Sequence, residues 1–96
     1  MEVSKDGQFD VIKYATSGTC SKMIFVKVKD GVVEDLGFVG GCPGNLQGIS
    51  HLAKGMNIDD LIARLEGIKC GAKDTSCPDQ LAKCLSEYKL GKFTAV

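Results

Sequence analysis

Apolar and polar residues alternate along the first forty positions in the way that strands of a half-buried sheet require. Residues 9–15 predict a short strand, and between Lys22 and Lys29 the apolar side chains at every second position share one face. Asp30-Gly31 indicates a two-residue hairpin turn, because both central residues of that turn need positive φ and this pair tolerates it. Residues 32–39 are then expected to return antiparallel.

The later part of the chain changes to helical spacing. A first helix is expected to start near Pro43, with Cys42 at its N-cap, and the same Cys-Pro pattern returns at Cys77 before a last helix. Asn57 is expected to cap a second helix. The predicted apolar stripes of the three helices are Leu46, Ile49, Leu52, Ala53 and Met56; Ile58, Leu61, Ile62 and Leu65; and Leu81, Cys84, Leu85 and Tyr88.

These elements predict an α+β fold in which helices pack on one face of a small antiparallel sheet of about three strands. The 96 residues suit a single domain, residues 1–96 with a core of about 9–90. The tail after Gly91 is expected to be short and loosely held.

Charge composition and the first residues limit the possible partners and location. Twelve basic and twelve acidic side chains cancel without forming runs, so neither nucleic acid nor a membrane surface is an expected partner. The start of the sequence lacks the pattern of a secretory signal, and no apolar run has membrane-spanning length. We therefore expect a cytoplasmic protein, and a homodimer through an exposed sheet edge stays open.

Five cysteines in so short a chain are the main chemical signal. In a reducing cytosol an odd number of cysteines favours metal binding or thiol chemistry over disulfides. Cys20, Cys42, Cys70 and Cys77 all fall in turns or at helix starts, where free N–H groups and the helix dipole favour the thiolate that binds a metal. We expect these four to form one metal site, although the chain has no Cys-x-x-Cys pair.

Other polar residues have simpler interpretations. Any of the four cysteines could instead be a small buried hydrophobe, and Cys84 is expected in the core because it lies on the apolar stripe of the last helix. His51 is expected to face solvent opposite the stripe of its helix. Gly40-Gly41 is more typical of a tight turn than of a phosphate cradle, and Asp59, Asp60 and Asp79 offset helix dipoles.

The pentapeptide Thr75-Ser-Cys-Pro-Asp79 resembles the signature of the TSCPD family. Further matches run from about Tyr14 to Leu85 and include Thr19-Cys20-Ser21, Gly40-Gly41-Cys42 and Gly67-Ile68-Lys69-Cys70-Gly71. The family includes small stand-alone proteins with four cysteines, and similar domains occur at the C-terminus of B12-dependent ribonucleotide reductases. The resemblance implies a metal-binding module without an established catalytic activity.

A more distant similarity links the chain to iron-sulfur cluster assembly scaffolds. Cys20, Cys42 and Cys77 match the order of the three scaffold cysteines, and Cys70 could supply a fourth ligand. The chain departs from the scaffold pattern at Lys22, which replaces an aspartate, and at Ser76, which replaces a histidine. The Leu-Pro-Pro motif that binds the chaperone is also missing.

The sequence thus leaves three functions open. The first is a non-catalytic module with one zinc ion held by Cys20, Cys42, Cys70 and Cys77. The second replaces zinc by an iron-sulfur cluster on the same thiolates, as a scaffold or carrier. The third is an accessory in ribonucleotide reduction that exchanges electrons through a dithiol, for which Cys70 and Cys77 are the expected pair.

Overall fold

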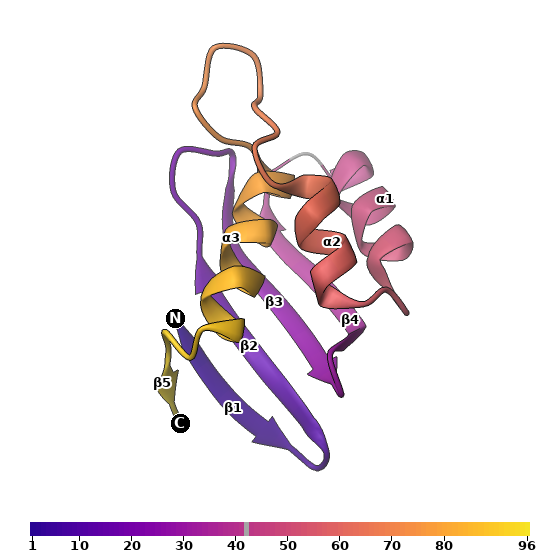
Figure 1. Ribbon diagram of the computed structural model, residues 1–96. Helices are drawn as coiled ribbons and strands as arrows, with labels where there is room; N and C mark the ends of the chain where they lie inside the picture. Colours follow the sequence, from indigo (N-terminus) through magenta and orange to yellow (C-terminus); the bar gives the residue numbers. More distant parts are fainter. Residues whose placement is uncertain (42) are drawn as a thin grey trace.

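The computed structural model describes residues 1–41 and 43–96, and this part of the chain forms one five-stranded sheet covered by three helices on one face (Figure 1). The elements are β1 (Glu2–Asp6), β2 (Phe9–Ala15), β3 (Ser21–Lys29), β4 (Val32–Gly40), α1 (Pro43–Ala53), α2 (Ile58–Leu65), α3 (Cys77–Lys89) and β5 (Thr94–Ala95). The strand order is β4-β3-β2-β1-β5. The α+β class is confirmed, but the expected number of about three strands is wrong.

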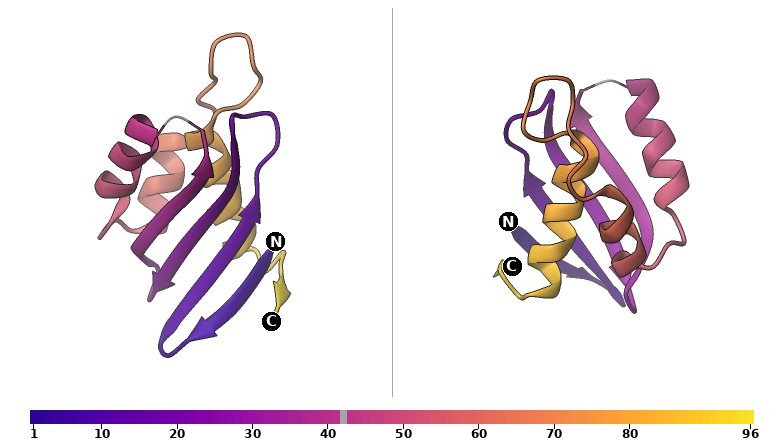
Figure 2. Two further views of the ribbon diagram at one scale, coloured as in Figure 1. Left: turned by 180° about the vertical axis from the view of Figure 1, so that it is seen from behind. Right: turned by 45° about the horizontal axis from the view of Figure 1, so that its top comes forward.

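The centre of the sheet is the antiparallel array β2-β3-β4 that the apolar alternation predicts. Ile24, Val26 and Val28 are at most 2% exposed and face the helices. Asp30 and Gly31 have φ of 51° and 75°, as the predicted hairpin turn requires. The other face of the sheet carries no helix among the described residues (Figure 2).

The two strands that the sequence did not predict lie side by side at the far edge of the sheet. β1 pairs antiparallel with β2, yet it buries a single apolar residue, Val3, so its alternation signal is weak. β5 pairs parallel with β1, and the N–H groups of Thr94 and Val96 donate to the carbonyls of Met1 (2.9 Å) and Val3 (3.0 Å). The expectation of a loosely held tail is therefore wrong, because backbone hydrogen bonds fix it.

The helices differ in how much of their surface the sheet covers. α3 lies over the middle of the sheet, where Leu81, Cys84 and Leu85 are fully buried. α2 begins after Asn57, whose side chain accepts a hydrogen bond from the N–H of Asp59 at 2.8 Å, as predicted. α1 packs over the β4 edge, so its covered stripe is narrow, and Leu52, predicted to be buried, is 78% exposed.

One end of the sheet collects the segments that carry the predicted site. The Cys20 loop (residues 16–20), the start of α1 and the Cys70 loop (residues 66–76) all lie beyond this end (Figures 1 and 2). The Cys70 loop projects furthest from the sheet. No helix within the described residues combines the length and the apolar character needed to cross a bilayer.

Candidate thiol site

A cavity of about 480 Å³ opens where these three segments meet. Cys20, Cys70 and Cys77 all line it, and its remaining wall comes mainly from the first turns of α1 and from Pro78. Three of the four predicted cysteines, distant in the sequence, thus share one cavity. Cys42 lies outside the described residues, but Gly44, two residues later, lines the same cavity.

The three cysteines differ in exposure. Cys20 and Cys70 are exposed on their loops, whereas Cys77 on α3 is 8% exposed, and all three are free thiols. Within residues 1–41 and 43–96, no group of three or more histidine, cysteine, aspartate or glutamate side chains is close enough to hold a metal ion. The fold therefore brings the three thiols to one cavity, but it does not place them close enough together to coordinate one metal ion.

The first turn of α3 is fixed by a serine cap. The Ser76 hydroxyl accepts a hydrogen bond from the N–H of Asp79 at 3.2 Å and donates to the carbonyl of Ile68 at 2.6 Å. Ser76, not Cys77, is therefore the N-cap, and Cys77 is the first helical residue. The Cys-Pro pattern predicted the helix start one residue too late, because serine is the better capping residue.

The Asp79 carboxylate joins the Cys70 loop to α3. Asp79 is 4% exposed; one carboxylate oxygen accepts from the N–H of Gly67 at 2.7 Å, and the other accepts from the Thr75 hydroxyl. Burial raises the pKa of this carboxyl, but those two donors and the Lys83 ammonium outweigh it and hold the pKa below its ordinary value. Asp79 thus does more than offset the helix dipole.

Gln80 connects the two loops that carry the exposed cysteines. Its side-chain carbonyl accepts from the N–H of Ser17 in the Cys20 loop at 3.2 Å, and its amide donates to the Thr75 hydroxyl at 3.0 Å. Gly18 packs so closely there that a Cβ would meet the Thr75 methyl group at 3.0 Å. The loops are therefore held against α3 by buried polar contacts.

The Cys77 thiol faces a pair of hydroxyl groups. Its sulfur lies 3.1 Å from the oxygen of Ser21, which is 3% exposed, and the Thr19 hydroxyl lies 3.1 Å from the same oxygen. Burial raises the pKa of the Cys77 thiol, but hydrogen bonds from the Ser21 hydroxyl, the Ser21 N–H, Thr19 and Cys20 hold it below the ordinary value. The site therefore makes the Cys77 thiol more acidic than an ordinary cysteine.

Comparison with known proteins agrees with the motif at the start of α3. The family model of the TSCPD domain matches residues 4–89 of the sequence. The chain belongs to the TSCPD family. No curated protein and no solved structure matches the sequence or the fold, so the similarity to iron-sulfur scaffolds stays a prediction.

In the pentapeptide that names this TSCPD domain, some residues have a structural role and one, the cysteine, belongs to the candidate site. Thr75, Ser76 and Asp79 hold the Cys70 loop on the helix, whereas Cys77 lines the cavity. Sequence reasoning missed Ser21, whose hydroxyl oxygen lies 3.1 Å from the Cys77 sulfur. The available signal was its position directly after Cys20, where a small polar residue enters the buried start of β3.

The remaining predictions for polar residues are confirmed where the structure tests them. Cys84 is fully buried, and burial raises its pKa to about 12, so it is a core thiol of the TSCPD domain. His51 is exposed. Gly40 and Gly41 have φ of 79° and 81°, and a Cβ on Gly41 would meet Leu46 at 2.6 Å, as a tight turn implies.

Proposed function

We propose that this TSCPD domain binds one zinc ion through the thiolates of Cys20, Cys42, Cys70 and Cys77 and has no catalytic activity of its own. The observation that carries the proposal is the shared cavity lined by Cys20, Cys70 and Cys77. Cys42 is included because of its place in the sequence, between β4 and the helix whose first turn lines that cavity.

The chemistry of the cavity fits a soft metal ion. Thiolates are the preferred ligands of structural zinc, and the donors around Cys77 already favour its deprotonated form. Lys73 also lines the cavity, and its positive charge would offset part of the negative charge of thiolates bound to a metal. A bound ion would tie two exposed loops to α3, so its binding free energy would stabilise the fold.

Elemental analysis of the full chain, purified without oxygen and without an affinity tag, tests the proposal. We expect about one zinc per chain and no acid-labile sulfide. Iron with sulfide and a brown colour would replace zinc by a cluster on the same residues, in line with the scaffold similarity. Absence of any metal, both as purified and after incubation with zinc or iron, would overturn the proposal.

A second candidate is thiol–disulfide exchange, and the contacts favour a pair other than the one expected from the sequence. Of the two exposed cysteines, Cys20 and not Cys70 contributes to the lowered pKa of Cys77. Two thiols there would lose two protons and two electrons to a disulfide substrate as their own disulfide forms. This function would depend on Cys20 and Cys77 and be indifferent to Cys70, whereas the zinc site needs all of them.

A further inference from the structure

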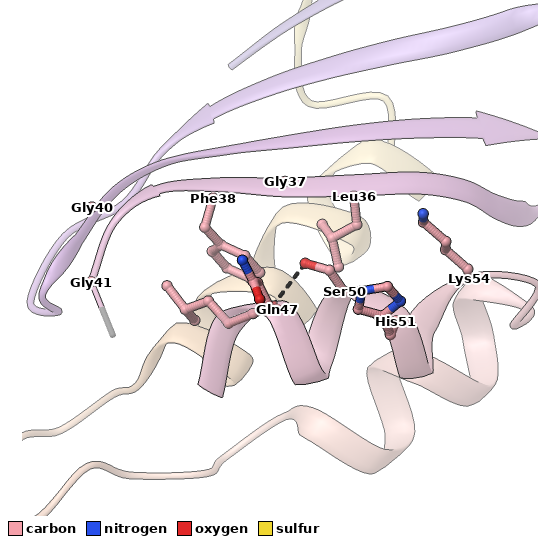
Figure 3. A pocket seen from close by; sticks show the side chains of 10 residues that line it. Leu36, Gly37, Phe38, Gly40, Gly41, Gln47, Ser50, His51 and Lys54 are labelled. Atoms are coloured by element: carbon pink, nitrogen blue, oxygen red, sulfur yellow. Dashed lines mark hydrogen bonds between the residues drawn. The ribbon is translucent and has the colours of Figure 1, made fainter. Parts of the chain in front are cut away.

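A second cavity, of about 530 Å³, lies between α1 and the edge strand β4, away from the cysteines (Figure 3). One wall is β4 from Leu36 to Gly40, and the other is the polar side of α1. Gln47, Ser50 and His51 lie on that side because their spacing places them on one face of the helix, and Lys54 follows directly after its last residue (Figure 3). The cavity is a slot between a strand edge and a polar helix face.

The strand edge in this slot has main-chain groups that point away from the sheet. The start of β4 is covered: Val33 donates to the carbonyl of Met56 at 2.9 Å and accepts from the N–H of Gly55 at 2.7 Å. Beyond this point no strand of the described residues pairs with the outer edge. Leu36 donates its N–H to the Asp35 side chain at 2.9 Å, so its main-chain groups face outward. Since residues of an antiparallel strand alternate, those of Phe38 do so as well.

The position of α1 limits what can pair with this edge. Figures 1 and 2 show α1 beside β4 with no strand beneath it. A strand that added to the outer edge of β4 would therefore be covered by α1 on one side. A second copy of the chain that paired through its own β4 would bring its own α1 into the same space. An extended peptide has no helix of its own, so this conflict would not arise.

We propose that this slot binds an extended peptide, which adds to β4 as a further strand and directs a carboxylate side chain toward α1. The described residues that line the slot include Lys54 and His51 but no carboxylate. Asp35, which does not itself line the slot, accepts from the N–H of Leu36 and forms an ion pair with Lys54 at 3.5 Å. The Asp35 carboxylate thus occupies the Leu36 N–H and the Lys54 ammonium, which are the groups that an acidic peptide would contact. In this way it blocks pairing at the edge of β4. This binding site goes beyond the proposed zinc site and shares no cysteine with it.

A designed pentapeptide, acetyl-Thr-Val-Glu-Val-Thr-amide, tests the proposal by titration into the isotope-labelled full chain, followed by amide chemical shifts. We expect shifts at Leu36–Gly40 and on the polar side of α1. The same peptide with N-methyl groups on alternate residues should not bind, because it cannot complete the strand. A peptide with lysine in place of glutamate should bind about tenfold more weakly.

Substitution of Asp35 is expected to raise the affinity for the peptide, a result that misfolding of the variant could not produce. Asp35→Ala exposes the Leu36 N–H and frees Lys54, so we expect the glutamate peptide to bind about tenfold more tightly. Glu34→Ala removes the same charge from the neighbouring position but leaves both Asp35 contacts, and its affinity should equal that of the wild type.

Several results would overturn the assignment. Equal binding of the N-methylated peptide would mean that the strand edge takes no part. Unchanged affinity in Asp35→Ala, or shifts centred on the cysteine cavity, would place the peptide elsewhere. If the β4 amides shift when the protein alone is concentrated, the occupant is a second copy of the chain. Absence of any shift at millimolar peptide would remove the site altogether.

Discussion

The start and the middle of α3 each bury one cysteine, and the pKa values of the two thiols are shifted in opposite directions. Cys77 is 8% exposed and Cys84, about two turns further along, is fully buried. Hydrogen-bond donors, with Ser21 foremost, hold the pKa of Cys77 below its ordinary value despite burial, whereas burial among apolar side chains raises that of Cys84 to about 12. Burial alone therefore does not decide what a cysteine does.

The difference has its origin in the neighbouring elements rather than in the helix. Cys77 meets the start of β3, where Ser21 and Thr19 supply hydroxyl groups. Cys84 belongs to the apolar cluster formed by the middle of the sheet and the helices that cover it. One helix thus supplies a thiol of lowered pKa to a cavity at one end and a small apolar side chain to the core further along.

The largest expected effect separates the two cysteines by their response to zinc. With free zinc at about 1,000 times its Kd, Cys77→Ser should lower the free energy of unfolding by about 4 kcal/mol, because zinc no longer stabilises the folded state. Cys84→Ala should cost about 1 kcal/mol whether or not zinc is present. Denaturant unfolding in zinc-buffered and zinc-free solutions checks both variants, and an equal loss for Cys77→Ser in both solutions would contradict the account.

Alkylation compares the two thiols within one molecule. In the native, metal-free chain at pH 8, iodoacetamide should modify Cys77 at least about 100-fold faster than Cys84, since the thiolate is the reactive species and access to Cys84 is blocked. Trypsin cleaves after Lys83 and so separates the two sites for mass spectrometry. Similar rates in the folded chain would show that the two environments do not differ as described.

Loss of the Asp79 carboxylate should have a smaller and pH-dependent effect. Asp79→Ala leaves the Gly67 N–H and the Thr75 hydroxyl without their acceptor, so we expect a loss of about 2 kcal/mol near neutral pH. Because folding lowers the pKa of Asp79, its contribution is present above the unfolded pKa of about 3.9 and is lost as the pH falls through the lower folded pKa.

The unfolding free energies of wild type and Asp79→Ala should therefore converge as the pH falls below about 4. Asp74→Ala, an exposed acidic residue of the same loop, is the matched control and should leave the free energy of unfolding nearly unchanged. A difference between wild type and Asp79→Ala that is constant down to strongly acidic pH would show that the carboxylate charge does not contribute.

The smallest effect concerns the hydroxyl that supports Cys77. Ser21→Ala removes the hydroxyl that accepts from the Cys77 thiol and stabilises its deprotonated form, without removing a thiol, so zinc affinity should fall by about tenfold, the lower end of the effect of groups that support metal ligands. Competition with a coloured chelator measures the affinity. Ser4→Ala, on β1 far from the cavity, serves as the control, and an equal fall in both variants would mean that Ser21 acts only through stability.

The sequence predicted best where apolar residues carry the fold. β2, β3, β4 and the buried faces of α2 and α3 follow from the spacing of their apolar side chains. β1 and β5 could not be predicted in this way, because backbone pairing holds them and only Val3 among their residues is buried. Leu52 was misplaced since the pattern cannot tell that α1 lies at a sheet edge.

For the candidate site, the sequence indicated which residues matter but not their surroundings. The placement of Cys20, Cys70 and Cys77 at turns and helix starts led to three residues that share a cavity. The support from Ser21, and the links that Asp79 and Gln80 make to distant loops, depend on contacts between segments far apart in the chain. No local pattern contains that information.

X-ray absorption at the zinc edge of the metal-loaded full chain tests the central claim most directly. Four sulfur neighbours at about 2.3 Å, reduced to three in Cys77→Ser and unchanged in Cys84→Ala, are the result that the account predicts. A shell of nitrogen and oxygen atoms, or four sulfur neighbours that persist in Cys77→Ser, would contradict it.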